Sequence, residues 1–86
     1  MSAAVEARVR EVIAQHARLP VDVNSLGDED DLFGAGMSSH ASVSVMLGLE
    51  DTFDVEFPDE MLKRTVFESV ASISRALREL QADVAA

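Results

Sequence analysis

The residues best placed to carry chemistry are two adjacent serines, Ser38 and Ser39. They follow a flexible approach that contains Gly34 and Gly36, and they stand at the start of a predicted helix. The first N–H groups of a helix have no partners within it and give that end a partial positive charge. A phosphate ester on Ser39 would therefore lie where the helix favours an anion. Both serines are also explained if they only cap the helix, so the pair alone leaves two interpretations open.

The other side chains offer few alternative chemistries. The absence of cysteine excludes disulfides, thiolate metal sites and cysteine nucleophiles. The acidic run 28–31 does not form an EF-hand, because Leu32 stands where an oxygen ligand is needed and Phe33 where glycine is needed. We expect no metal site, no catalytic residues and no enzyme activity, since the sequence shows neither a catalytic triad nor a phosphate-binding glycine loop followed by lysine. Glu50 and Asp51 are adjacent and point in different directions, which favours contact with basic residues of a partner.

The helix predicted over residues 39–53 carries two apolar patches. At about 100° per residue, the core face consists of Val45, Met46, Leu49 and Phe53. Val43 and Leu47 fall on another side, which is typical of a partner-docking surface; alternatively, they pack beneath the preceding loop. The expected docking residues are Met37, Ser38, His40, Val43, Ser44, Leu47, Glu50 and Asp51.

The elements that position this helix follow from apolar spacing. Further helices are predicted over residues 3–17 and 67–80, with a short helical turn at 59–64 and a fraying C-terminus. His16 lies on the apolar stripe of the first helix and is interpreted as a packing residue. Residues 19–38 predict a long loop, held on the core by Val21, Val23, Leu26, Leu32 and Phe33. The fold class is all-α: a small four-helix bundle with three principal helices, one short helix and a long first loop, forming one domain over residues 1–86.

Composition narrows the function classes. An 86-residue chain with no Trp, no Tyr and four Phe builds a modest aliphatic core with little room for a buried active site. A net charge of −9 argues against nucleic acid and anionic membranes as partners. The negative charge favours solubility, and it also favours salt-sensitive encounters with basic partners; composition does not choose between the two explanations. The sequence shows no signal peptide and no transmembrane stretch, so the cytoplasm is the expected location.

The residues resemble the acyl carrier protein family, whose attachment motif is commonly Gly-x-Asp-Ser-Leu. The matching string is Leu32-Phe-Gly-Ala-Gly-Met-Ser-Ser39-His. The segment from Leu49 to Glu60 is similar to the family's Leu-Glu-x-x-Phe-x-x-x-Ile-Pro-Asp-Glu, its distance from Ser39 agrees without a gap, and Thr65-Val-Phe resembles the lead into the last helix. The resemblance covers almost the whole chain.

This resemblance implies that Ser39 receives 4′-phosphopantetheine from coenzyme A, through a separate phosphopantetheinyl transferase. The arm would carry a thioester between partner enzymes, and the carrier would be a monomer. Ser38 replaces the family's usual Asp and His40 its usual Leu, which indicates a specialised carrier with a dedicated partner. The string from Gly36 to Val43 is also similar to small bacterial carriers that are charged with amino acids by stand-alone ligases related to seryl-tRNA synthetases. That similarity implies an aminoacyl cargo, typically glycine or alanine, which is passed to a downstream acceptor enzyme.

Two alternatives stay open at this point. One is a fatty-acyl or polyketide acyl carrier protein. The other is a helical protein–protein adaptor without a prosthetic group, in which the serines only cap. The adaptor predicts that Ser39→Ala leaves function intact while Leu47→Asp abolishes it, whereas a carrier loses function with either substitution.

Overall fold

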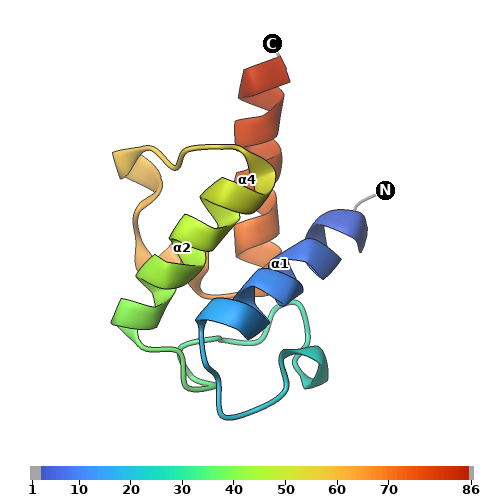
Figure 1. Ribbon diagram of the computed structural model, residues 1–86, viewed down its shortest axis with the longest axis vertical. Helices are drawn as coiled ribbons and strands as arrows, with labels where there is room; N and C mark the ends of the chain where they lie inside the picture. The colour runs from blue at the N-terminus through green and yellow to red at the C-terminus, as the bar shows by residue number, and fades with distance from the viewer. Residues whose placement is uncertain (1–2, 86) are drawn as a thin grey trace.

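The computed structural model describes residues 3–85, and all regular secondary structure in that range is helical (Figure 1). Its elements are α1 (Ala3–His16), the 3₁₀ helix η1 (Val23–Ser25), α2 (Ser39–Phe53), the 3₁₀ helix η2 (Asp59–Met61), α3 (Arg64–Phe67) and α4 (Val70–Ala85). The three long helices and the short α3 confirm the predicted all-α bundle. The bounds of α2 agree with the prediction at both ends.

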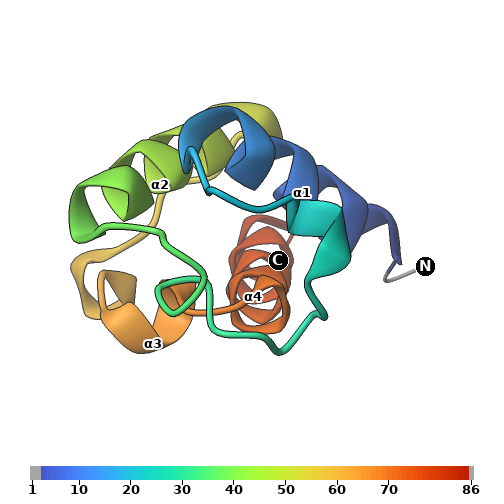
Figure 2. The ribbon, with the colours of Figure 1, turned by 90° about the horizontal axis from the view of Figure 1, so that it is seen from below.

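The three long helices pack around one aliphatic core. Seen from below, α4 is viewed end-on, with α1 and α2 on one side of it and α3 on another (Figure 2). The residues with no exposed surface are mainly aliphatic: Val9, Ile13, Leu32, Val45, Leu49, Val70, Ile73 and Leu77, together with Ser74. Phe57 and Phe67 add one edge-to-face ring pair, with centroids 5.3 Å apart. A core of this kind is what the aromatic-poor composition predicts.

The approach of α1 to α2 depends on His16 and Gly48. A Cβ atom on Gly48 would lie 2.7 Å from Cδ2 of His16 and 3.0 Å from Cγ1 of Val12. The missing side chain thus lets the end of α1 pack closely on α2, with the imidazole ring of His16 against the glycine. This confirms the interpretation of His16 as a packing residue.

The long first loop is only partly as predicted. Val23 and Leu32 are buried, and Leu26 and Phe33 are half-buried against the core, as expected. Val21 is 45% exposed, so its predicted role in holding the loop is wrong. The chain turns into η1 at Asp22, whose carboxylate accepts the N–H of Asn24 at 2.9 Å, and this turn brings Val23 rather than Val21 to the core.

Hydrogen bonds fix the loop to the rest of the bundle. Arg10 of α1 donates to the carboxylate of Asp28 at 2.6 Å, and the N–H of Ala71 donates to the carbonyl of Asp28 at 2.8 Å. The N–H of Leu32 donates to the carbonyl of Glu68 at 2.7 Å. The loop that leads to Ser39 is therefore attached to both α1 and the junction between α3 and α4.

The helical elements after residue 58 differ from their predicted bounds. The turn expected at 59–64 is two elements, η2 and α3, and the helix expected from residue 67 begins at Val70. Ser69 and Ser72 explain this start, because the N–H of each donates to the hydroxyl oxygen of the other, at 3.1 and 3.0 Å. The helix also continues to Ala85, beyond its predicted end at Leu80; Ala86, the last residue of the C-terminus expected to fray, lies outside the described residues.

A buried hydroxyl in α4 gives a test of the packing. Ser74 is fully buried, and its Oγ has no hydrogen-bond partner among residues 3–85. Ser74→Ala removes this unsatisfied group and improves helix propensity, so we expect the free energy of unfolding to rise by about 1 kcal/mol. Urea denaturation measures this change. Ser72→Ala is the matched control with the opposite sign, because the Ser72 hydroxyl donates to the carbonyl of Val66 at 2.8 Å; equal effects of the two substitutions would contradict the argument.

Candidate functional site

Ser38 and Ser39 have different roles in the structure. Ser38 has the extended backbone of an N-cap residue, and its hydroxyl accepts the N–H of Ala41 at 3.0 Å. Ser39 is the first residue of α2 and is exposed. Its hydroxyl makes no hydrogen bond with any other described residue, while its carbonyl accepts from Ser42 at 2.6 Å. Because Ser38 supplies the cap, capping does not account for Ser39.

The approach to Ser39 is held by one buried side chain and one unusual turn. Gly36 has φ +122°, in the region that only glycine adopts easily. Met37 follows it into the core with 3% exposure, and its N–H donates to the carbonyl of Leu32 at 3.0 Å. The turn therefore buries Met37 and leaves Ser38 and Ser39 at the surface.

Gly36→Ala is expected to disrupt this approach. A Cβ atom at residue 36 would lie 2.6 Å from Cδ of Pro20, and the backbone conformation is strained for any residue with a side chain. We expect the free energy of unfolding to fall by about 3 kcal/mol, measured by urea denaturation. Gly27→Ala is the matched control, because the nearest atom there lies at an ordinary 3.6 Å and the glycine has no positive φ. Equal stability of the two variants would contradict this account.

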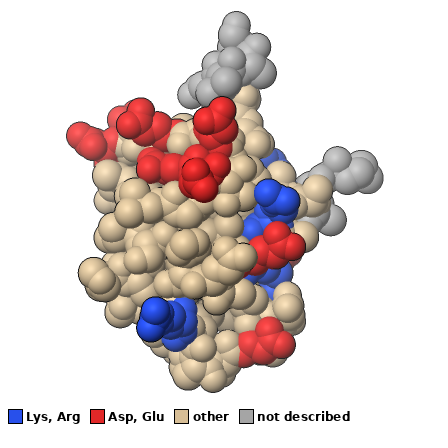
Figure 3. Space-filling model, in the orientation of Figure 1, with Lys and Arg blue, Asp and Glu red and all other residues tan. Residues whose placement is uncertain are grey.

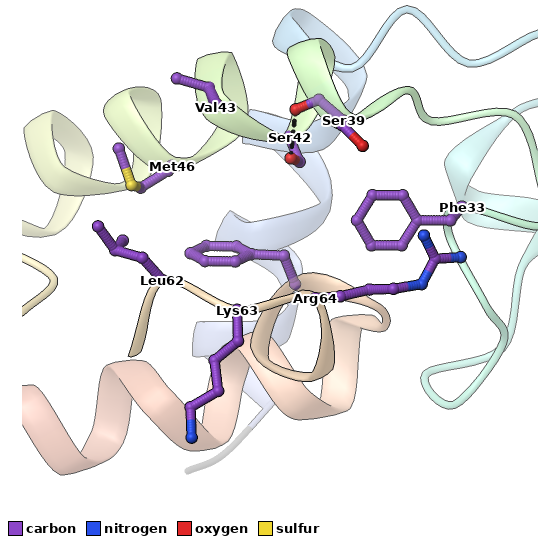
Figure 4. Close-up of a pocket in the computed structure, with 9 residues that line it drawn as sticks. Phe33, Ser39, Ser42, Val43, Met46, Leu62, Lys63 and Arg64 are labelled. Atoms are coloured by element: carbon purple, nitrogen blue, oxygen red, sulfur yellow. Dashed lines mark hydrogen bonds between the residues drawn. The ribbon is translucent and has the colours of Figure 1, made fainter. Parts of the chain in front are cut away.

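Ser39 lies at one end of a groove between α2 and the η2–α3 segment (Figure 4). The groove has a volume of about 480 Å³. Its walls are mostly apolar, with two cations near one side; they consist of Phe33, Ser39, Ser42, Val43, Met46, Leu62, Lys63, Arg64 and Phe67. An arm attached at Ser39 would start at the end of this groove.

The expected docking residues separate into exposed and engaged ones. His40 and Asp51 are exposed, Ser44 is half-buried, and Val43 and Leu47 are 50% and 55% exposed. The interpretation that Val43 and Leu47 pack beneath the loop is therefore wrong. We define the outer face of α2 as His40, Val43, Ser44, Leu47 and Asp51.

Three expected docking residues are engaged within the protein. Met37 is buried in the core, because the Gly36 turn directs it inward, so its side chain is not available to a partner. The hydroxyl of Ser38 is occupied by its cap. Glu50 is half-buried and accepts the N–H of Phe57 at 2.8 Å, which ties the end of α2 to the next segment. We therefore correct the docking set by leaving out Met37 and assigning Glu50 a structural contact.

The sequence reasoning missed the far wall of the groove. Leu62, Lys63 and Arg64 line this wall, although they are more than twenty residues from Ser39. The available signal was an adjacent Lys-Arg pair beside an apolar residue in a chain with only seven Lys and Arg. Nothing in that signal indicates that it lies next to Ser39.

Charge is unevenly distributed on the face that includes α1 and α2 (Figure 3). Acidic side chains gather over the C-terminal end of α2 and the η2 segment, whereas the middle of this face carries no charge. The exposed acids there are Asp51, Asp54, Glu56, Asp59 and Glu60.

The part of the chain that the structure describes contains no group of three His, Asp or Glu side chains arranged to hold a metal ion. No helix between residues 3 and 85 combines the length and apolar composition needed to cross a bilayer.

Comparison with known proteins identifies the family of this chain. Residues 7–77 match the family described as phosphopantetheine attachment site. The aminoacyl carrier protein of Agrobacterium fabrum strain C58 is 45% identical over 74 residues, which are 86% of this chain and 89% of that protein.

Two solved structures are also similar to this chain. One is the crystal structure of an engineered Bradyrhizobium japonicum glycine:carrier protein ligase, complexed with a carrier protein from Agrobacterium tumefaciens and ATP. A chain in it matches with a TM-score of 0.85 and 44% identity, over 87% of this chain and 97% of that one. A solution structure from Agrobacterium tumefaciens matches with a TM-score of 0.73 and 44% identity, over 94% and 99%. The chain therefore belongs to the phosphopantetheine attachment family, whose members hold 4′-phosphopantetheine as a covalent prosthetic group.

Proposed function

We propose that this protein is an aminoacyl carrier whose prosthetic group is attached to Ser39. The observation that carries the proposal is the exposed Ser39 hydroxyl, which has no hydrogen-bond partner within residues 3–85 while Ser38 caps the helix. The prosthetic group supplies a terminal thiol, on which an aminoacyl group is held as a thioester. A chain without cysteine has no thiol of its own for this purpose.

Attachment requires a separate phosphopantetheinyl transferase. No described side chain contacts the Ser39 hydroxyl through a hydrogen bond, so none is placed to remove its proton. His40 is the next residue along the helix and points away from Ser39. The transferase must therefore provide the base and bind coenzyme A, and Ser39 acts only as the acceptor of the phosphopantetheine group. This protein accordingly acts as a substrate of its partner enzymes and not as an enzyme.

The proposed cargo is an amino acid of small size, such as glycine or alanine. Support comes from the two relatives, one named as an aminoacyl carrier and the other solved with a glycine:carrier protein ligase. The loading partner is then an amino acid ligase of that kind, related to seryl-tRNA synthetases, and a downstream enzyme accepts the cargo. A cytoplasmic location stays part of the proposal on the sequence argument. A fatty-acyl or polyketide cargo is the second candidate, favoured by the apolar walls of the groove beside Ser39.

Intact-mass measurement tests the attachment. The purified protein is incubated with coenzyme A and a broad-specificity phosphopantetheinyl transferase, and peptide fragmentation locates the added mass. We expect one phosphopantetheine on Ser39. If neither this enzyme nor the transferase of the native host adds it, the protein is the helical adaptor instead. The modified protein is then offered ATP, an amino acid ligase and either glycine, alanine or a fatty acid, and the mass gain identifies the cargo.

A further inference from the structure

Arg64 is placed beside the proposed attachment residue and has no acidic partner among the residues that the structure describes. Three other arginines lie within 4.0 Å of carboxylates, in the pairs Arg8–Glu11, Arg10–Asp28 and Arg78–Glu6. Arg64 forms no such pair with any residue that the structure describes, and the same holds for Arg18, Lys63 and Arg75. The guanidinium of Arg64 instead lies over the ring of Phe33, with Cζ 4.1 Å from the centroid.

The groove brings this cation to the end where Ser39 stands. Ser39, Phe33 and Arg64 line the same groove from three different segments: the start of α2, the first loop and α3. In Figure 4 the Ser39 side chain points toward the ring of Phe33, and the Arg64 side chain runs along the groove to end beside the same ring. The neighbouring Lys63 points away from α2 and from Ser39. Only one of the two adjacent cations is therefore directed to Ser39.

The stacking on Phe33 suits Arg64 to bind an anion. An exposed cation–π contact stabilises by about 0.5–1 kcal/mol, enough to restrict a long side chain without occupying its N–H groups. A planar guanidinium can donate two parallel hydrogen bonds to phosphate oxygens, which are stronger than bonds between neutral groups. The Arg64 side chain is therefore already ordered before it binds an anion.

We propose that Arg64 binds the phosphodiester that links the prosthetic group to Ser39, with Phe33 as the platform that holds the guanidinium in place. The site takes a singly charged phosphodiester, and it fixes the base of the arm at the end of the groove. This inference rests on the proposed attachment at Ser39. It makes Arg64 a binding residue for the prosthetic group.

Phosphorus NMR of the modified protein tests the proposal. The ³¹P resonance is recorded for the wild type, Arg64→Gln, Arg64→Lys and the control Lys63→Gln, which removes the same charge one residue away. Spectra are taken as salt is raised from about 0.1 M to about 1 M, over which the Debye length falls from about 10 Å to about 3 Å. We expect the wild-type resonance to move with salt toward that of a free phosphodiester, and Arg64→Gln to show the free value throughout. Arg64→Lys keeps the charge but not the planar fork, so it should give an intermediate shift, and Lys63→Gln should resemble the wild type.

The outcomes separate this inference from the proposed function. Absence of the arm from the wild type contradicts attachment at Ser39. An arm that is present but gives the same ³¹P resonance in the wild type and Arg64→Gln overturns the role of Arg64. Equal effects of Arg64→Gln and Lys63→Gln would also overturn it, because they would indicate a general charge effect. The Nε–Hε resonance of Arg64, compared before and after modification, gives a second readout, and no change there counts against the proposal.

Discussion

Ser39→Ala is expected to abolish attachment of 4′-phosphopantetheine completely. Alanine has no hydroxyl to accept the group, and the other serines near the start of α2 are engaged: the hydroxyl of Ser38 accepts from Ala41, and that of Ser42 donates to the carbonyl of Ser39. The variant should fold normally, since Ser39 is exposed and its hydroxyl makes no bond to the rest of the described chain. Intact mass after incubation with transferase and coenzyme A measures the loss, and circular dichroism with a thermal melt checks the fold.

Ser38→Ala is the matched control for this result. It removes the cap and should lower the free energy of unfolding by about 1 kcal/mol, yet it leaves the Ser39 hydroxyl in place. We expect this variant to gain the full mass of one phosphopantetheine. The opposite pattern, with modification lost in Ser38→Ala and kept in Ser39→Ala, would move the attachment site to the preceding serine. It would also contradict the division of roles seen at the start of α2.

Both bounds of α2 could be predicted because their signals are local. Ser38 caps one end, and at the other the chain leaves the helix at Asp54 with φ 55° and ψ 50°. Between these residues the apolar spacing has a helical period, and Val45 and Leu49 on the predicted core face are fully buried. The position of Ser39 follows from the same signals. These signals do not give Ser39 its role: the prediction that it is the attachment residue comes from the resemblance to the acyl carrier protein family.

The rest of the site depends on contacts that sequence spacing does not encode. Met37 and Val21 both belong to a loop whose sequence has no periodicity. Met37 is buried by tertiary contacts, whereas Val21 is left exposed. The start of α4 is set by a reciprocal pair of serines, a weaker pattern than the usual box with Glu or Gln. The far wall of the groove comes from residues 62–64, whose approach to Ser39 is a property of the assembled bundle.

Leu47→Asp is expected to reduce loading of the modified protein by about 100-fold. Leu47 is 55% exposed at the centre of the outer face of α2, a helical turn from Val43, which is 50% exposed, and no covering element is present among residues 3–85. Truncating a hot-spot residue near the centre of an interface costs about 2 kcal/mol or more, and each 1.4 kcal/mol is about tenfold. The measurement is kcat/KM of an amino acid ligase with the phosphopantetheine-bearing variant as its substrate.

Val21→Asp is the matched control, because it places the same charge on a residue of similar exposure, 45%, outside α2. We expect it to be loaded within about twofold of the wild type, as is usual for exposed residues away from an interface. Leu47→Ala should fall between the two, since it removes apolar contact without adding charge. Attachment of the arm is measured first on each variant, so that a defect in the transferase step is not counted as one in loading. Equal loading of Leu47→Asp and Val21→Asp would show that the ligase does not contact the outer face of α2. The exposed apolar pair would then serve the transferase or the downstream acceptor, and the same substitutions measured with those enzymes would distinguish the two.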